Sequence, residues 1–205
     1  MDCYLKGLQD PRLASYFKVA KKDGAYHGVR NGQTSRSQGT LSEAASSMNV
    51  GQASSILWMD AAETYFLLAE AKLRLNLGDK TVKEYYEEGV KTSFSSKGAS
   101  GAESYLDNDV NVPSTSFIDP TNGRNTDVSR MVSTLTVKWD ESASPDKKLE
   151  RIMVQKWIAL FPDGQEAWSE MRRTGYPGIV TINTNASGGE VATGELLSLI
   201  HISEP

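Results

Sequence analysis

Two pairs of carboxylates stand at helical spacing in this sequence, and paired carboxylates can act as a general acid and base. Glu63 and Glu70 are seven residues apart, which places them on one helix face. Glu166 and Glu170 are four apart, with Arg173 close by. Glycosidase carboxylates normally face each other across a cleft from separate elements, about 5 to 10 Å apart. We therefore expect the first pair to bond backbone or basic groups of adjacent helices, and the second pair to form an ion-paired surface.

Metal and cofactor chemistry finds little support. The turn Asp107-Asn108-Asp109 could suggest calcium, but it lacks the glycine and closing glutamate of an EF-hand loop, so a solvated turn is expected. Cys3 is the single cysteine, which excludes an internal disulfide and a cysteine-based zinc site. A histidine metal cluster is not expected from two histidines, His27 and His201. We predict no metal, no cofactor and no catalytic residue.

A polar loop holds the candidate binding residues. Tyr26, His27 and Arg30 lie in a stretch from Lys21 to Gly39 that is rich in glycine, serine, asparagine and lysine, and loops often carry function. Carbohydrate recognition uses flat rings against sugar faces, with amide and guanidinium groups bonding the hydroxyls. These three residues are therefore our candidates, although Tyr26 taken alone is better explained as an ordinary surface tyrosine. Core positions are predicted for Trp58, Trp157 and Trp168, which sit in helical patterns.

Composition bounds the class of protein. The chain has 205 residues, 39% of them hydrophobic and 23% charged, with a formal net charge of −4. This acidic balance argues against a nucleic-acid partner, which usually meets a basic patch. No stretch approaches the roughly 18 apolar residues of a membrane-spanning helix.

Two long helices form the clearest predicted structure, over residues 54–96. Ser54 or Ser55 can cap a helix that runs through Leu77, with apolar positions at steps of three and four. Gly78-Asp79 ends it, and a second helix is expected from Thr81 to Ser95. The resulting hairpin is similar to a tetratricopeptide unit, which cannot bury its apolar face alone.

The remaining regions are predicted from their turn residues. Residues 1–52 and 97–146 read as mostly irregular, and 132–139 as either a strand or a helical lead-in. Helix is expected from about Pro145 to Phe161, and again from Asp163 to Gly175, before an extended tail. The last segment, 197–205, is similar to a translated sequencing adapter, so we exclude it and its His201 from functional argument.

Three sequence blocks, in order, resemble the SusD/RagB family of outer-membrane nutrient-binding lipoproteins. They are Ala61–Ala71 (AAETYFLLAEA), Tyr85–Ser93 (YYEEGVKTS), and the block from Gln155 (QKWIALF) through Gln165 (QEAW) to Arg172–Pro177 (RRTGYP). Asp10–Leu13 (DPRL) also resembles a family segment that precedes these blocks. The resemblance covers residues 10–180.

The resemblance implies a fold and a function. The fold would be mostly α-helical and SusD-like, a scaffold of tetratricopeptide-like hairpins with long irregular loops. Members are lipid-anchored at the cell surface of Bacteroidetes-type bacteria, bind glycans or peptides without catalysis, and pass them to a TonB-dependent, SusC-like transporter. Their sugar-stacking aromatics follow no fixed motif, so none is carried over. We expect residues 1–196 to be the C-terminal portion of such a protein, with blocks at 54–96 and 145–177, and the lipid anchor to lie outside this chain.

Three hypotheses follow. The first is a surface ligand-binding lipoprotein that transfers its ligand to a transporter. The second is an intracellular helical-repeat scaffold that binds peptides, which the hairpin at 54–96 supports. The third, a glycoside hydrolase, is disfavoured because no pair of carboxylates is expected to face across a cleft.

Overall fold

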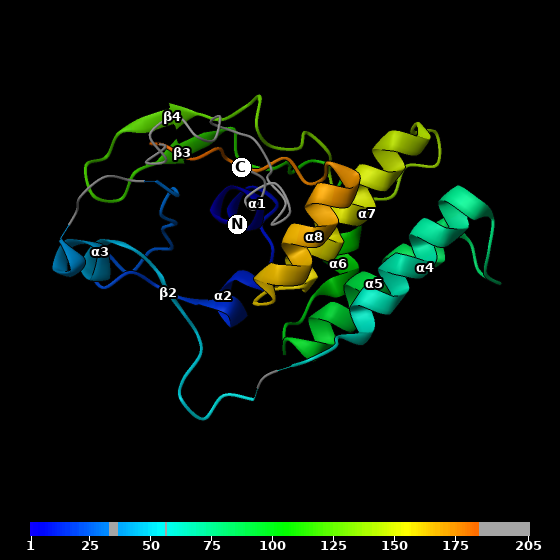
Figure 1. Cartoon of the computed structure of the whole chain (residues 1–205), viewed down its shortest axis with the longest axis horizontal. Coiled ribbons are helices and arrows are strands. Elements are labelled where there is room, and N and C mark those ends of the chain that lie inside the picture. The colour runs from blue at the N-terminus through cyan, green and yellow to red at the C-terminus, as the bar shows by residue number, and fades with distance from the viewer. Residues whose placement is uncertain (33–36, 56, 185–205) are drawn as a thin grey trace, which may run out of the picture.

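The computed structural model describes residues 1–32, 37–55 and 57–184, which are mostly helical, as predicted. Four long helices lie together on one side of the molecule, and most of the shorter elements lie on the other (Figure 1). The long helices are α4 (Ala61–Leu75), α5 (Val82–Ser96), α7 (Pro145–Ala159) and α8 (Gly164–Thr174). The short helices are α1 (Asp2–Gly7), α2 (Leu13–Tyr16), α3 (Gln38–Ala44) and α6 (Ala102–Leu106). Two antiparallel strand pairs are β1 (Phe17–Lys18) with β2 (Ser47–Met48), and β3 (Ser116–Ile118) with β4 (Asn125–Asp127).

Helices α4 and α5 form the predicted hairpin. Asn76, in the left-handed conformation, ends α4, and a capping box between Thr81 and Glu84 starts α5. The two helices approach closely at Gly89, where an added Cβ would lie 2.8 Å from the Phe66 ring. A small residue is therefore required at this crossing.

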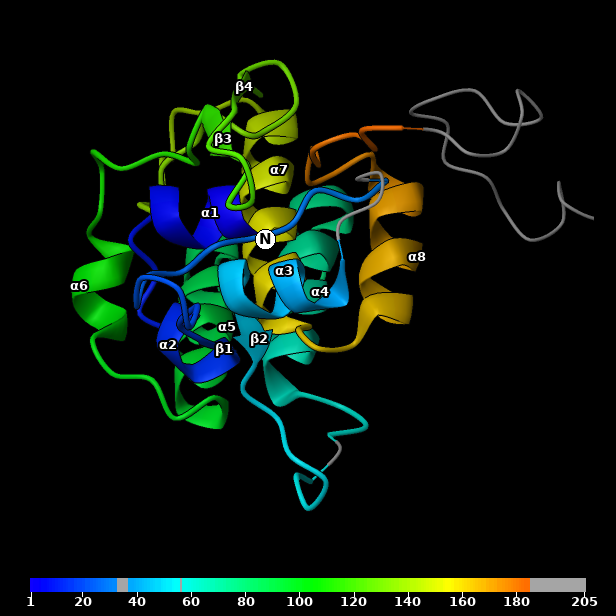
Figure 2. The same cartoon turned by 90° about the vertical axis from the view of Figure 1, so that its left-hand side faces the viewer.

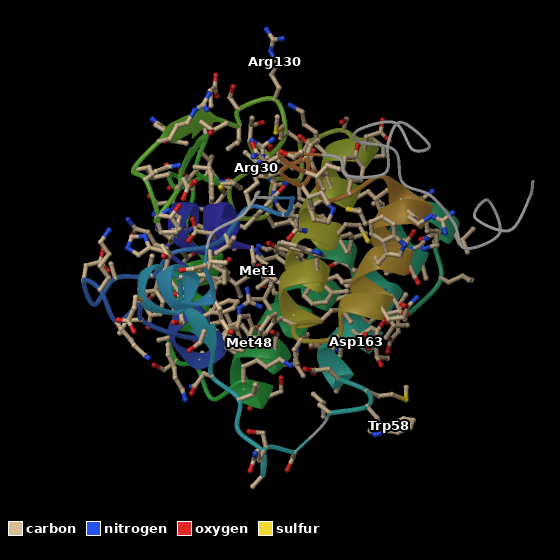
Figure 3. All side chains as sticks on the ribbon, turned by 60° about the vertical axis from the view of Figure 1, so that its left-hand side comes forward. Met1, Arg30, Met48, Trp58, Arg130 and Asp163 are labelled. Atoms are coloured by element: carbon tan, nitrogen blue, oxygen red, sulfur yellow. The ribbon has the colours of Figure 1, made fainter. Side chains whose placement is uncertain are left out.

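The predicted start of α4 was wrong. The helix begins at Ala61 instead of near Ser54, because the Asp60 carboxylate caps it by accepting from the Ala62 amide at 3.0 Å. Residues 50–55 and 57–59 are exposed and lie away from the body of the molecule (Figure 2). The prediction of a core Trp58 was also wrong, since it is 90% exposed and points outward (Figure 3). Ile56, which falls within the predicted helix, lies outside the described residues.

Helix α7 is the central element of the core. Ser144 caps it at the Lys147 amide, Pro145 occupies its first turn, and the apolar side chains of Ile152 and Ile158 are fully buried. Helix α8 follows, and it ends at Gly175 in the left-handed conformation, as expected. The region 97–146 is loop-rich, but 132–139 is neither strand nor helix. Its backbone is held from the side instead, for example by the Tyr86 hydroxyl, which donates to the Val137 carbonyl at 2.6 Å.

A buried arginine joins the N-terminal segment to the long helices. Arg12 has no exposed surface, and its guanidinium lies 2.6 Å from an oxygen of Asp10. It also donates to Ser93 of α5 at 2.9 Å and to Gln155 of α7 at 2.7 Å. Burial alone would lower the pKa of Arg12, but the Asp10 carboxylate outweighs it and raises the pKa, so the side chain stays charged.

A second ionic cluster attaches α8. Lys156 of α7 is 1% exposed, and its Nζ lies 3.3 Å from a carboxylate oxygen of Glu63 and 3.1 Å from one of Glu170. Both distances are those of ion pairs, and the Lys156 ammonium group makes no well-oriented hydrogen bond to a described residue. Arg173 of α8 bonds both Glu70 of α4, at 2.7 Å and 2.5 Å, and Glu170. Only Met171 of α8 is buried, so this helix is held largely by charge.

Glu166 of α8 lies near the charges of this cluster, and its effect on stability should depend on pH. Burial and the nearby Glu63 carboxylate raise the pKa of Glu166. A raised pKa in the folded state means that ionised Glu166 destabilises the fold. This destabilisation is absent below the usual carboxylate range, and it develops as pH rises through the folded-state pKa. We expect Glu166→Gln to stabilise the protein at pH 8 by less than about 1 kcal/mol, because solvent screens the partly exposed group. Thermal melts should show this gain shrinking at pH 4, and a gain that is larger at pH 4 would contradict it.

Candidate functional site

A cavity of about 400 Å³ lies between the N-terminal segment, the loop at 26–31 and the residues that follow α8. Its lining residues come from parts of the chain that are distant in sequence. They are Met1–Tyr4, Leu13, Phe17, Tyr26–Asn31, Ser46, Phe117, Trp157, Ile179 and Val180. The volume falls in the range of small-ligand pockets, which are typically apolar with a few polar groups.

Aromatic and aliphatic side chains make up the apolar part of the cavity. Trp157 of α7 packs edge-on against Tyr4 of α1, with ring centroids 5.4 Å apart. The Tyr4 hydroxyl donates to the Gly178 carbonyl at 2.6 Å and accepts from the Ser133 amide at 3.0 Å. Burial raises the pKa of Tyr4, so the hydroxyl remains a donor at neutral pH. This part of the site is therefore held rigidly from the core.

The polar part of the cavity is the loop that carries Tyr26 and His27. Lys6 of α1 donates to the backbone carbonyl of Tyr26 at 3.1 Å, so this contact does not involve the phenol ring. The His27 amide donates to the Ser46 hydroxyl at 2.9 Å, and its imidazole Nε2 lies 2.8 Å from a carboxylate oxygen of Asp23. The loop is thus fixed by backbone atoms and by the contact between His27 and Asp23, and both Tyr26 and His27 are among the residues that line the cavity.

Gly28 allows this loop to sit against α1. Its amide donates to the Asp2 carboxylate at 3.2 Å, and an added Cβ would lie 2.6 Å from the Asp2 Cβ. The close approach excludes a larger residue, which explains why glycine follows Tyr26-His27 in the sequence.

Arg30 differs from the other two candidates because its guanidinium is already engaged. Its Nε donates to the Thr181 carbonyl at 2.7 Å, and a terminal nitrogen donates to the Ile182 carbonyl at 3.4 Å. The other terminal nitrogen lies 3.5 Å from the Asn183 side-chain oxygen. Arg30 therefore joins the loop to the segment after α8.

The structure brings Tyr26, His27 and Arg30 to one cavity, but their binding role stays a prediction. Sequence reasoning missed the contribution of Trp157, which it assigned only to the core. The tryptophan packs partly against the core and also lines the cavity. Its helical spacing gave no signal of this second role, because the loop that faces it is folded over from another part of the chain.

The other candidate chemistries are resolved by local contacts. Glu63, Glu70 and Glu170 form ion pairs, as expected, whereas Glu166 forms none with a described residue. The side-chain oxygen of Asn108 accepts from the amides of Val110 and Asn111, so this segment is a turn. Among the described residues, no group of three acidic, histidine or cysteine side chains is arranged to hold a metal ion. None of the described helices has the length and apolar character needed to cross a membrane.

The predicted tryptophans and thiol divide between surface and core. Trp168 lies on α8 and is 37% exposed, so its predicted core position was wrong. It lies on a helix whose one buried residue is Met171, so Trp168 remains at the surface. Cys3 is buried, and burial raises the pKa of its thiol, which suits a packing role. The segment 197–205 lies outside the described residues.

The structure is a helical scaffold that supports a cavity lined by loop residues and by aromatic residues. Residues 1–204 match the family model described as SusD-like, the SusD and RagB outer membrane lipoproteins. The chain therefore belongs to the SusD/RagB family of outer membrane lipoproteins. These are binding proteins and not enzymes, which agrees with the first of the three hypotheses.

Solved structures agree with this assignment. A SusD homologue from Bacteroides thetaiotaomicron VPI-5482 is 42% identical with a TM-score of 0.80, over 88% of this chain and 38% of that protein. A chitin-binding SusD homologue from Flavobacterium johnsoniae is 41% identical with a TM-score of 0.85, over 94% of this chain and 40% of that protein. A SusD homologue from Bacteroides uniformis ATCC 8492 is 39% identical with a TM-score of 0.83, over 94% of this chain and 40% of that protein. No curated protein sequence matches the chain.

The chain spans about two fifths of the length of these solved relatives. The fold of this part is thus established as SusD-like, and its helices correspond to part of a larger binding protein.

Proposed function

We propose that the whole protein captures glycans at the cell surface and delivers them to a TonB-dependent transporter without chemical turnover. The observation that carries the proposal is the cavity, in which a Trp157 and Phe117 apolar surface meets the polar loop of Tyr26 and His27. Sugars present both apolar faces and hydroxyl groups, so a binding site needs both kinds of surface.

Chitin oligosaccharides are the first ligands to test. The Flavobacterium johnsoniae relative, 41% identical to this chain, binds chitin. An N-acetylated sugar carries an apolar methyl group beside its amide, and the mixed lining of this cavity can accommodate both. Peptides are the alternative ligand class, and a peptide library run in parallel distinguishes the two.

Tyr26→Ala is expected to weaken binding of a chitin tetrasaccharide about five- to tenfold. An aromatic contact contributes about 0.5 to 1.5 kcal/mol beyond burial of its area, and 1.4 kcal/mol corresponds to a factor of ten in affinity. Isothermal titration calorimetry on the chain with and without the substitution measures the change.

Trp58→Ala is the matched control for this test. Trp58 is a highly exposed aromatic residue that does not line the cavity, so its removal should leave the affinity unchanged. A loss with Trp58→Ala and none with Tyr26→Ala would move the site to the segment before α4. Release of shortened oligosaccharides during the titration would contradict the non-catalytic proposal.

Transfer to a transporter is tested separately. The protein should co-purify from outer membranes with a TonB-dependent transporter, and this association should not depend on Tyr26. Recovery of the protein without any such transporter would contradict the delivery step.

A further inference from the structure

We propose that Arg30 is a positioning residue for the candidate site: it clasps the segment 179–184 onto the loop 26–31 and so fixes two walls of the cavity. This inference rests on the proposed function for its ligand, but the clasp itself is a structural claim. It revises the role of Arg30, which the sequence placed among the residues that contact the ligand.

Among the residues that the structure describes, the hydrogen-bond partners of Arg30 side-chain nitrogens all lie in one short segment. Nε donates to the Thr181 carbonyl at 2.7 Å, and one terminal nitrogen lies 3.4 Å from both the Thr181 hydroxyl and the Ile182 carbonyl. The second terminal nitrogen reaches the Asn183 side chain at 3.5 Å. The planar guanidinium has donors pointing in several fixed directions, which suits one side chain holding consecutive residues.

Backbone contacts align the same two segments. The Asn183 amide donates to the Asn31 carbonyl at 2.8 Å. At Gly32, an added Cβ would lie 2.5 Å from the Thr184 carbonyl oxygen, so the two chains run in close contact there. Arg30 thus reinforces a junction that backbone atoms have already brought together. Figure 3 shows Arg30 beside the ribbon of this segment.

Residues 179–184 need such a clasp because they belong to neither a helix nor a strand. Their upstream end is fixed by the Tyr4 hydroxyl, which donates to the Gly178 carbonyl. Beyond Gly178, Ile179 and Val180 line the cavity before the chain reaches Arg30. These two cavity-lining residues therefore lie between the hydrogen bond at Gly178 and the Arg30 clasp, and Val180 also packs against the core.

The opposite wall depends on the same residue. Tyr26 and His27 precede Arg30 in one loop, and all three line the cavity. Loss of the clasp should let the wall at Ile179 and Val180 separate from this loop. The ligand would then meet a wider and less ordered cavity, although no group that contacts it has been removed.

Arg30→Met tests the clasp, with Arg130→Met as the matched control. Arg130 is exposed and projects into solvent, so its removal changes the same charge without touching the cavity (Figure 3). Hydrogen exchange measured by mass spectrometry reports on the amides of 179–184. Calorimetry with a chitin tetrasaccharide reports on the site. We expect Arg30→Met to speed exchange in 179–184 about tenfold and to weaken binding by a similar factor, with neither change in the control.

Arg30→Lys adds a test of rescue. Lysine keeps the charge but has one compact donor group, so we expect partial recovery of both readouts in parallel. Recovery of the exchange rate without recovery of affinity would overturn the positioning role.

The outcomes separate the clasp from the proposed function. Faster exchange with unchanged affinity, or weaker affinity with unchanged exchange, would overturn the inference, the second because Arg30 would then contact the ligand directly. If the unmodified chain binds no tetrasaccharide, the glycan proposal fails while the exchange result still decides the clasp. In that case faster exchange supports the clasp and unchanged exchange overturns it.

Discussion

Arg12→Met is expected to lower the free energy of unfolding by about 3 to 5 kcal/mol, the range for breaking a buried ion pair from one side. The substitution leaves the Asp10 carboxylate buried, at 3% exposure, without its cationic partner. It also removes hydrogen bonds to Ser93 and Gln155, which lie on two different long helices. The effect should therefore appear as a loss of global stability, with a lower midpoint in urea.

Two comparisons isolate the cause. Arg130→Met removes an exposed arginine and should change stability by less than about 0.5 kcal/mol. The double variant Asp10→Asn with Arg12→Met removes the stranded charge, so it should recover part of the loss. If Arg12→Met and Arg130→Met have equal urea midpoints, the buried cluster does not contribute as we infer.

Lys156→Met is the second substitution with a large expected effect, a loss of about 3 kcal/mol at pH 7. Lys156 lies between the carboxylates of Glu63 and Glu170, and at 1% exposure it is more deeply buried than Glu70, the other buried residue of the cluster that attaches α8. Methionine has a similar length, so the loss reflects charge more than volume. We expect α8 to exchange its amides faster as well, because only Met171 anchors it by burial.

The pH dependence of this loss has a defined sign. Burial alone would raise the pKa of Glu170, but the hydrogen bond from Arg173 and the charge of Lys156 outweigh it and lower the pKa. Because its pKa is lower in the folded state, the Glu170 carboxylate stabilises the fold above the usual carboxylate range. This stabilisation is lost as pH falls through the folded-state pKa. The difference between Lys156→Met and the unmodified chain should therefore shrink below about pH 4.

Lys147→Met, on the exposed face of the same helix, is the control for this substitution. It should alter stability by less than about 0.5 kcal/mol at either pH. A loss for Lys156→Met that stays constant from pH 7 to pH 3 would contradict the ionic explanation.

Most of the helical scaffold could be predicted from residues that act locally. The capping box at Thr81, the proline after Ser144 and the terminating Gly175 set helix ends through contacts within a few positions. The start of α4 was misplaced because Ser54 and Asp60 are both competent caps. The choice between them depends on Ser96 and Lys97, which bond the Asp60 carboxylate from the end of α5 at 2.9 Å and 3.3 Å.

The candidate site was only partly predictable for the same reason. The loop residues Tyr26 and His27 stood out by their composition, and the structure places both on a cavity. The apolar wall opposite them is built by Trp157, whose helical spacing is that of any core residue. Arg30 was chosen as a ligand contact because nothing in the local sequence reveals the segment at 181–183 as its partner.

The sequence by itself determined the family and most of the helical scaffold, because these depend on ordered motifs and on helical periodicity. Only the tertiary structure decided which residues share a cavity. It also decided that Arg12 is buried between the N-terminal segment and the long helices, and that Arg30 contacts the segment after α8. Arg12 and Arg30 are both arginines in irregular N-terminal sequence. Their roles differ because one is enclosed by Asp10, Ser93 and Gln155, and the other faces the carbonyls of a distant segment.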